Sequence, residues 1–245
     1  MRQPLMAGNW KMFKNESETI SFLEELKPRV ADVKDRDILI CTPFPNLSRA
    51  CEAAVGSNIN IGAQNIYWED EGAFTGEVSG SMLKAIGCTY VIIGHSERRQ
   101  YFGETDETVN KKIFAALKHN LLPIVCVGES LEQREKGETF KIIEKQIKNG
   151  LYSLEIGHWE FVIIAYEPVW AIGTGKTATP EQAQEVHAFI RGLLPAEVKD
   201  KIRILYGGSV KPDNVKELMA QPDIDGGLVG GASLNVESFV KLIKY

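Results

Sequence analysis

The chain has 245 residues, 44% of them hydrophobic and 25% charged, with a formal net charge of -5. This composition is typical of a globular protein with a sizeable core, and its dispersed basic residues argue against nucleic-acid or membrane partners. The first residues hold too short an apolar run for a signal peptide, and the four cysteines show no metal-ligand spacing. We therefore expect a cytoplasmic protein without disulfides or bound metal.

Eight short apolar segments, most of them rich in β-branched residues, follow one another along the chain with helical patterns between them. They are residues 4–9, 37–43, 59–65, 90–95, 122–129, 161–167, 202–208 and 226–231. Continuous apolar runs of this length are typical of strands buried on both faces of a parallel sheet. Eight such β-α units without a linker predict a single (β/α)8 barrel over residues 1–245, with an open doubly wound sheet as the alternative.

The helical segments carry apolar residues at the spacing of one helix face. The helix after residue 179 has the clearest start, because Thr179 can cap it, Pro180 suits its first position and Gln182 can complete a capping box. Asn235 can cap the last helix. The expected buried faces are Ile20, Leu23, Leu26 and Val30; Val109, Ile113, Ala116 and Leu117; Ala183, Val186, Ile190 and Leu194; and Val236, Phe239, Val240 and Ile243.

Polar residues and glycines end most of the apolar segments, and the carboxyl ends of the strands form the active face of such a barrel. These residues are Asn9, Lys11, Gln64, Asn65, His95, Glu97, Glu129, Glu167, Gly207, Gly208, Ser209, Gly230 and Gly231. We therefore expect a base, a histidine and a cation to meet on one rim.

Glu167 is the expected general base. Pro168 fixes the backbone beside it, and apolar neighbours would raise the proton affinity of the carboxylate. A strand-end carboxylate can also be only a helix cap or half of an ion pair. His95 follows a buried strand, where a neutral imidazole could donate a hydrogen bond to a carbonyl oxygen, although a single histidine is more often structural.

Lys11 is the expected cation, because an ammonium group at a strand end would attract an anionic substrate and stabilise an oxyanion. A solvated surface lysine is the alternative. Glu97 could orient Lys11, take part in catalysis, or form a structural ion pair with Arg98 or Arg99. The glycine turns after the seventh and eighth segments lie where barrels of this kind usually bind phosphate, through backbone N–H groups.

The sequence Gly175-Lys176-Thr177 resembles part of a nucleotide-binding loop, but Trp170 stands where that loop needs its first glycine. A dinucleotide turn would have to follow the strand directly, and six residues intervene. The segment is instead expected to be a lid that excludes water, with a static glycine-rich turn as the alternative. The lid comprises Pro168, Val169, Trp170, Ala171, Ile172, Gly173, Thr174, Gly175, Lys176, Thr177 and Ala178.

Six segments, AGNWKM, IIGHSERR, FGETDE, AYEPVWAIGTGKTAT, LYGGSV and GLVGGASL, resemble the signature segments of the triosephosphate isomerase family, in order from the first strand to the last helix. The glutamate and histidine roles are known for that family. The resemblance implies that Glu167 shuttles a proton between two carbons of a triose phosphate. It implies that neutral His95 polarises the carbonyl, that Lys11 holds negative charge and that Asn9 is a further donor.

The resemblance also implies phosphate binding by backbone groups of Gly173, Ser209, Gly230 and Gly231. The reaction implied is the interconversion of dihydroxyacetone phosphate and D-glyceraldehyde 3-phosphate in glycolysis and gluconeogenesis, without a metal or organic cofactor. Residues 71–79 resemble the loop by which each subunit of a homodimer enters its neighbour. Phe74, Thr75 and Gly76 would form its tip, although from the residues alone this loop could equally pack on its own barrel.

Two other functions compete with this interpretation. A Schiff-base aldolase would need a lysine inside a strand, and none of the eight apolar segments contains one. A non-catalytic phosphate-binding barrel would explain the glycine turns, but not a base, a histidine and a cation on the same rim.

Overall fold

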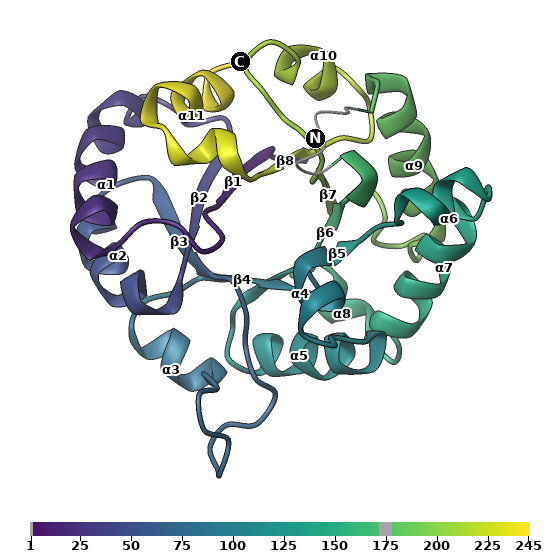
Figure 1. Ribbon diagram of the computed structural model, residues 1–245, viewed down its shortest axis with the longest axis horizontal. Coiled ribbons are helices and arrows are strands. Elements are labelled where there is room, and N and C mark those ends of the chain that lie inside the picture. The colour runs from purple at the N-terminus through teal and green to yellow at the C-terminus, as the bar shows by residue number, and fades with distance from the viewer. Residues whose placement is uncertain (1, 172–177) are drawn as a thin grey trace.

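The computed structural model describes residues 2–171 and 178–245. Its eight strands pair in parallel and in chain order, and the eighth pairs with the first to close a barrel inside a ring of helices (Figure 1). The strands are β1 (Leu5–Asn9), β2 (Asp37–Thr42), β3 (Ile59–Ala63), β4 (Tyr90–Ile93), β5 (Leu122–Val127), β6 (Ile163–Tyr166), β7 (Arg203–Tyr206) and β8 (Gly226–Val229). Each strand lies within one predicted segment, so the (β/α)8 barrel is confirmed and the open sheet is excluded.

Several helices begin at a residue whose side chain caps them. Thr179 and Gln182 form the predicted capping box, and Asn235 accepts a hydrogen bond from the backbone N–H of Ser238. The helices are α1 (Glu16–Val30), α2 (Leu47–Ala54), α3 (Gly80–Ala85), α4 (Ser96–Tyr101), α5 (Asp106–Lys118), α6 (Leu131–Glu135), α7 (Thr139–Gly150), α8 (Ile156–Trp159), α9 (Pro180–Leu193), α10 (Val215–Met219) and α11 (Val236–Ile243), with 3-10 turns η1 (Phe44–Asn46), η2 (Val169–Ala171) and η3 (Gly231–Leu234).

The predicted helix faces are confirmed in part. All four residues predicted for the helix after residue 179 are buried. In α1 the prediction was wrong at Ile20, which is only partly buried, because Thr19 and Phe22 take the inner positions. Phe22 packs edge-on against Trp10, with ring centroids 4.8 Å apart, so a contact distant in sequence sets which side of the helix faces inward.

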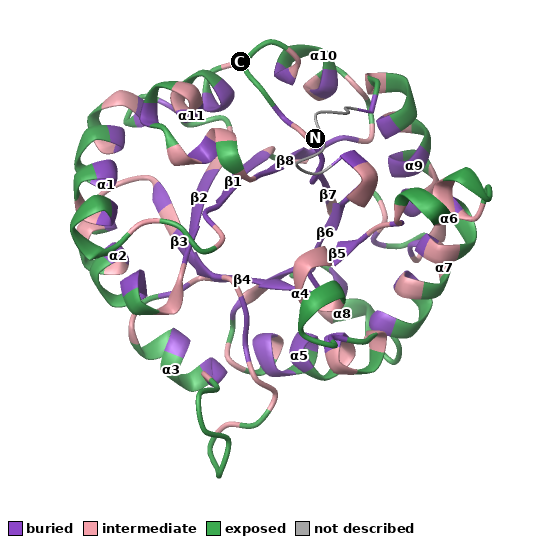
Figure 2. Cartoon of the chain, in the orientation of Figure 1, coloured by how far each residue is buried: buried purple, intermediate pink, exposed green. Residues whose placement is uncertain are grey.

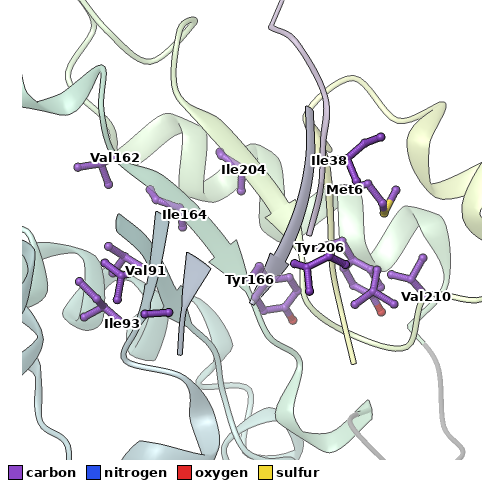
Figure 3. Packing of buried hydrophobic residues seen from close by; sticks show 14 of the residues in the cluster. Met6, Ile38, Val91, Ile93, Val162, Ile164, Tyr166, Ile204, Tyr206 and Val210 are labelled. Atoms are coloured by element: carbon purple, nitrogen blue, oxygen red, sulfur yellow. The ribbon is translucent and has the colours of Figure 1, made fainter. Parts of the chain in front are cut away.

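Successive side chains of each strand point to opposite faces of the sheet and belong to two different cores. Leu5 and Ala7 belong to the cluster inside the barrel, whereas Met6 belongs to the cluster between strands and helices. Figure 3 shows this outer layer, where Ile38 and Ile204 lie among other buried side chains. Both faces of every strand are therefore covered, as Figure 2 shows by burial, which explains the continuous apolar runs.

A long connection between β3 and α3 projects beyond the ring of helices (Figure 1), and its tip is exposed (Figure 2). It contains residues 64–79, with Phe74, Thr75 and Gly76 at the exposed end. Within residues 2–171 and 178–245, no helix is long and apolar enough to cross a membrane.

Candidate active site

A cavity of about 370 Å³ opens at the carboxyl ends of the strands. Its lining includes most of the residues predicted for the rim, which come from β1, β4, β6, β7 and β8 and the turns after them. These are Asn9, Lys11, His95, Glu167, Gly207, Gly208, Ser209, Gly230 and Gly231. Gln64, Asn65 and Glu97 line an adjoining cavity of about 350 Å³.

His95 and Glu167 contact each other directly in this cavity. The Nε2 atom of His95 lies 2.9 Å from Oε1 of Glu167. The other ring nitrogen, Nδ1, accepts a hydrogen bond of 3.2 Å from the backbone N–H of Glu97. Because Nδ1 is an acceptor, a neutral ring carries its proton on Nε2, the atom that faces the carboxylate.

The contact controls the pKa of both groups. Burial alone raises the pKa of the Glu167 carboxyl, but the attraction of His95 and a hydrogen bond from the Ser96 N–H bring it below its ordinary value. Burial lowers the pKa of His95, and the Glu167 carboxylate more than offsets this, so that pKa is raised. The expectation that Glu167 has a raised proton affinity is therefore wrong for this arrangement.

Lys11 lines the cavity and has an unusual backbone conformation. Its φ is +51°, in the left-handed region that residues with side chains seldom adopt. The Asn9 side chain accepts a hydrogen bond of 3.1 Å from the Lys11 N–H, which supports this turn. Such local strain is common at functional sites.

Of the three alternatives for Glu97, contact with Lys11 is the one that the geometry supports. The Lys11 ammonium lies 2.6 Å from Oε1 of Glu97. Structural pairing of Glu97 with a neighbouring arginine is excluded, because Arg98 pairs with Glu104 and Arg99 with Asp106. The backbone N–H of Glu97 also holds His95, so one residue positions both the cation and the imidazole.

The two glycine turns differ in what surrounds them. A Cβ at Gly207 would lie 2.9 Å from Cγ of Glu167, and one at Gly208 would lie 2.3 Å from the Tyr206 hydroxyl. Gly207 therefore gives the base room, and Gly208 gives room to the Tyr206 side chain. No atom lies within 4 Å of a Cβ built at Gly231, and the nearest atom to one at Gly230 is Cε of Lys11, 3.5 Å away. The second turn thus leaves open space beside the cation.

Glu129 has a different role from the other rim residues. It is fully buried and lines neither cavity, and its Oε1 accepts hydrogen bonds from Tyr166, Arg134 and Trp170. The Trp170 contact, at 3.0 Å, ties the start of the expected lid to the end of β5. The sequence analysis did not predict this contact. The only signal for it in the sequence was the indole N–H of Trp170.

The expected lid is described at its two ends only. Pro168, Val169, Trp170 and Ala171 precede the gap, and Ala178 follows it. The remaining lid residues, Ile172, Gly173, Thr174, Gly175, Lys176 and Thr177, lie outside the described residues, and so does the predicted phosphate contact of Gly173. In the rest of the chain, no group of three or more His, Cys, Asp or Glu residues is placed to hold a metal ion.

The chain resembles known proteins along its whole length. A family model described as triosephosphate isomerase matches residues 4–245. A triosephosphate isomerase of Endomicrobium trichonymphae is 60% identical, covering 100% of this chain and 99% of the relative. One of Moorella thermoacetica is 56% identical with the same coverage. The crystal structure of triosephosphate isomerase from Bartonella henselae superposes with a TM-score of 0.89 at 40% identity, covering 98% of this chain and 97% of that one. The chain therefore belongs to the triosephosphate isomerase family.

Proposed function

We propose that the chain interconverts dihydroxyacetone phosphate and D-glyceraldehyde 3-phosphate through an enediolate, a step of glycolysis and gluconeogenesis. The observation that carries the proposal is the 2.9 Å contact between His95 Nε2 and Glu167 Oε1, in one cavity with Lys11. Proton transfer next to a carbonyl needs a base, a hydrogen-bond donor and a group that stabilises negative charge. A non-catalytic phosphate-binding barrel would have no need for these three groups in one cavity.

Glu167 is the proposed base, and substrate binding would strengthen it. A substrate carbon placed at the carboxylate, with its carbonyl oxygen at His95, would separate the two side chains. The attraction that lowers the pKa of Glu167 would then weaken, whereas burial, which raises that pKa, would remain. The carboxylate would thus become a better proton acceptor when substrate arrives.

His95 and Lys11 are the proposed partners of the substrate oxygens. The Nε2–H of neutral His95 donates to the carbonyl oxygen and moves protons between the two oxygens of the enediolate. The ammonium group of Lys11, held by Glu97, stabilises the negative charge that develops there. Asn9, which lines the same cavity, is a further donor.

The substrate phosphate is proposed to bind at the glycine turns. Ser209, Gly230 and Gly231 line the cavity with Lys11, and glycine backbones let phosphate oxygens approach N–H groups closely. Gly173 is the proposed fourth contact, brought in by closure of the lid. Water exclusion by that closure would protect the enediolate, which can otherwise lose its phosphate.

We infer that two copies of the chain form a homodimer through the projecting residues 71–79. The smaller cavity next to the active site is lined partly by apolar side chains, among them Met12 and Phe102. Met12 is 93% exposed and Phe102 68% exposed in the single chain. Exposed apolar surface of this kind is typical of an interface, and the Phe74 tip of a second copy would cover it.

The proposed function is tested by a coupled assay of glyceraldehyde 3-phosphate isomerisation on the protein and its Glu167→Gln variant. Loss of a general base costs about 10²–10⁴-fold in turnover, while binding of a phosphate-bearing substrate analogue should persist. Glu24→Gln, an exposed position on α1, is the matched control and should keep full activity. Turnover of the Glu167→Gln variant equal to that of the unmodified protein would disprove the role of this residue.

A further inference from the structure

One charged residue that lines the active-site cavity has no part in the reaction proposed above. Lys211 lies in the connection between β7 and α10 and lines the same cavity as Ser209 and Gly230. It is exposed, and within residues 2–171 and 178–245 no hydrogen bond or ion pair holds its ammonium group. A lysine that is only solvated would have the same properties, so its surroundings decide between the two roles.

Hydrogen bonds fix the backbone of Lys211 beside the proposed phosphate site. The Asn214 side chain accepts a bond of 2.8 Å from the Lys211 N–H and donates one of 3.0 Å to the Ser209 carbonyl oxygen. The Lys211 carbonyl oxygen accepts bonds from the backbone N–H groups of Asn214 and Val215, at 3.1 and 3.0 Å. Val210, between the two residues that line the cavity, is buried in the core. The exposed lysine side chain therefore starts from a fixed point of the cavity lining.

The other charged side chains that line the cavity are already paired. The Lys11 ammonium lies 2.6 Å from a carboxylate oxygen of Glu97, and a carboxylate oxygen of Glu167 lies 2.9 Å from the ring of His95. His95 is neutral in the proposed reaction. The one positive and two negative charges of Lys11, Glu97 and Glu167 then leave a net negative charge, which repels an anion.

A phosphate ester brings a charge of about −1.5 to −2 at pH 7, so a triose phosphate meets this repulsion as it enters. Backbone N–H groups carry partial charges and attract an anion only at short range. A full positive charge acts over about 10 Å at 0.1 M salt. Among the described residues that line the cavity, Lys211 supplies the one unpaired positive charge. It therefore cancels the net negative charge of the site before the substrate arrives.

We propose that Lys211 attracts the substrate phosphate to the glycine turns and makes the site specific for phosphorylated trioses. The proposal rests on the isomerase function proposed above. The phosphate carries the same charge in the substrate and in the enediolate, so this attraction strengthens the binding of both equally. Removal of the charge should therefore raise KM and leave kcat unchanged.

The test is steady-state kinetics of glyceraldehyde 3-phosphate isomerisation by the full-length protein and its Lys211→Met variant. At about 10 mM salt, where charges act over about 30 Å, we expect KM to rise about fivefold and kcat to stay within about twofold. The inhibition constant of inorganic phosphate should rise by a similar factor. At about 1 M salt, where charges act over about 3 Å, the two proteins should have equal KM values.

Two further variants make the test specific. Lys211→Arg keeps the charge and should retain the KM of the unmodified protein. Lys216→Met removes a charge at an exposed position of α10 that does not line the cavity, and it should leave KM and kcat unchanged. An unchanged KM of the Lys211→Met variant at low salt, an equal rise in the Lys216→Met variant, or a rise that persists at high salt would overturn the proposal.

Failure of the proposed isomerase function would give a different result. If the unmodified protein does not isomerise glyceraldehyde 3-phosphate, calorimetric titration with inorganic phosphate still tests Lys211, because binding needs no turnover. Weaker phosphate binding by the Lys211→Met variant would then support the binding role of this residue without the reaction. Equal phosphate binding by the two proteins would refute it.

Discussion

At the scale of single residues, the glycines near Glu167 keep space for the base. The Glu167 backbone passes so close to Gly128 that a Cβ at Gly128 would lie 1.8 Å from the Glu167 backbone carbonyl oxygen. A Cβ added at Gly207 would be less crowded, because the atom nearest to it belongs to the Glu167 side chain, which can move. Substitution there should therefore displace the base without unfolding the barrel.

We predict that Gly207→Ala lowers kcat by about 10²-fold, because a shift of about 1 Å at a reacting group has an effect of that order. The added Cβ would lie 2.9 Å from Cγ of Glu167 and would push the carboxylate from its place. Binding of a phosphate analogue should change little, since the second glycine turn is untouched. Steady-state kinetics measures kcat, and inhibitor titration measures the affinity for the phosphate analogue.

The control for this substitution is Gly192→Ala, at an exposed position of α9 where an added Cβ meets no atom within 4 Å. It should leave kcat unchanged and stabilise the protein by roughly 0.5–1 kcal/mol, because alanine loses less conformational freedom in a helix. Equal kcat values for the two variants would contradict the steric explanation.

At the scale of elements, α9 begins where the expected lid ends. The Thr179 hydroxyl accepts a hydrogen bond of 3.2 Å from the backbone N–H of Gln182, and the Gln182 side chain accepts one of 3.0 Å from the Thr179 N–H. Ala178, directly before the cap, is buried. The capping box therefore fixes one end of the lid segment, and the Glu129–Trp170 hydrogen bond fixes the other.

We predict that Thr179→Ala lowers the free energy of unfolding by about 1 kcal/mol, the usual cost of losing an N-cap hydroxyl. Thr179→Ser, which keeps the oxygen, should lose much less. Urea denaturation followed by circular dichroism measures both variants, and an Ala variant as stable as the Ser variant would show that the cap contributes nothing.

The elements were predictable from the sequence because their signals are local. Eight apolar runs and the caps at Thr179 and Asn235 depend on neighbouring residues only. The sequence predicts which strand-end residues form the site, but it does not predict which of them contact one another. The hydrogen bond from Ser96 to Glu167 joins residues 71 positions apart, and the pKa of Glu167 depends on it. The anchoring role of Glu129 likewise depends on a contact that only folding creates.

At the scale of the whole molecule, the predicted single domain implies unfolding in one cooperative transition whose midpoint depends on pH. His187 is fully buried, and its Nδ1 lies 3.1 Å from the Asp223 carbonyl oxygen. Burial lowers the pKa of His187 from 6.5 to about 4. The unfolded chain therefore binds a proton between these values while the folded chain does not, and stability falls as pH falls.

We predict that this histidine removes up to about 3 kcal/mol of stability between pH 7.5 and pH 4, by the linkage of pKa to folding. His187→Gln cannot be protonated, so its unfolding free energy should fall less over that range, even if it is lower at pH 7.5. Urea titrations of both proteins at several pH values measure the difference. Parallel pH profiles would contradict the role of His187.

The proposed homodimer is also a property of the whole molecule. We predict that Thr75→Arg, which puts a charge on the exposed tip, yields a monomer by light scattering and lowers kcat/KM, because the cavity beside Asn9 and Lys11 is left open. Thr75→Ser should remain a dimer. A monomeric Thr75→Arg variant with full activity would refute the role of residues 71–79.

The closure of the barrel by β8 against β1 has a consequence for biosynthesis. The site draws on Asn9 near the start of the chain and Gly231 near its end. Synthesis proceeds at about 5–20 residues per second from the amino terminus, so the catalytic rim is incomplete until β8 has left the ribosome. Until then the nascent sheet has two open edges, which are prone to pair with other chains. A chain that ends before residue 226 would therefore be inactive and would tend to aggregate.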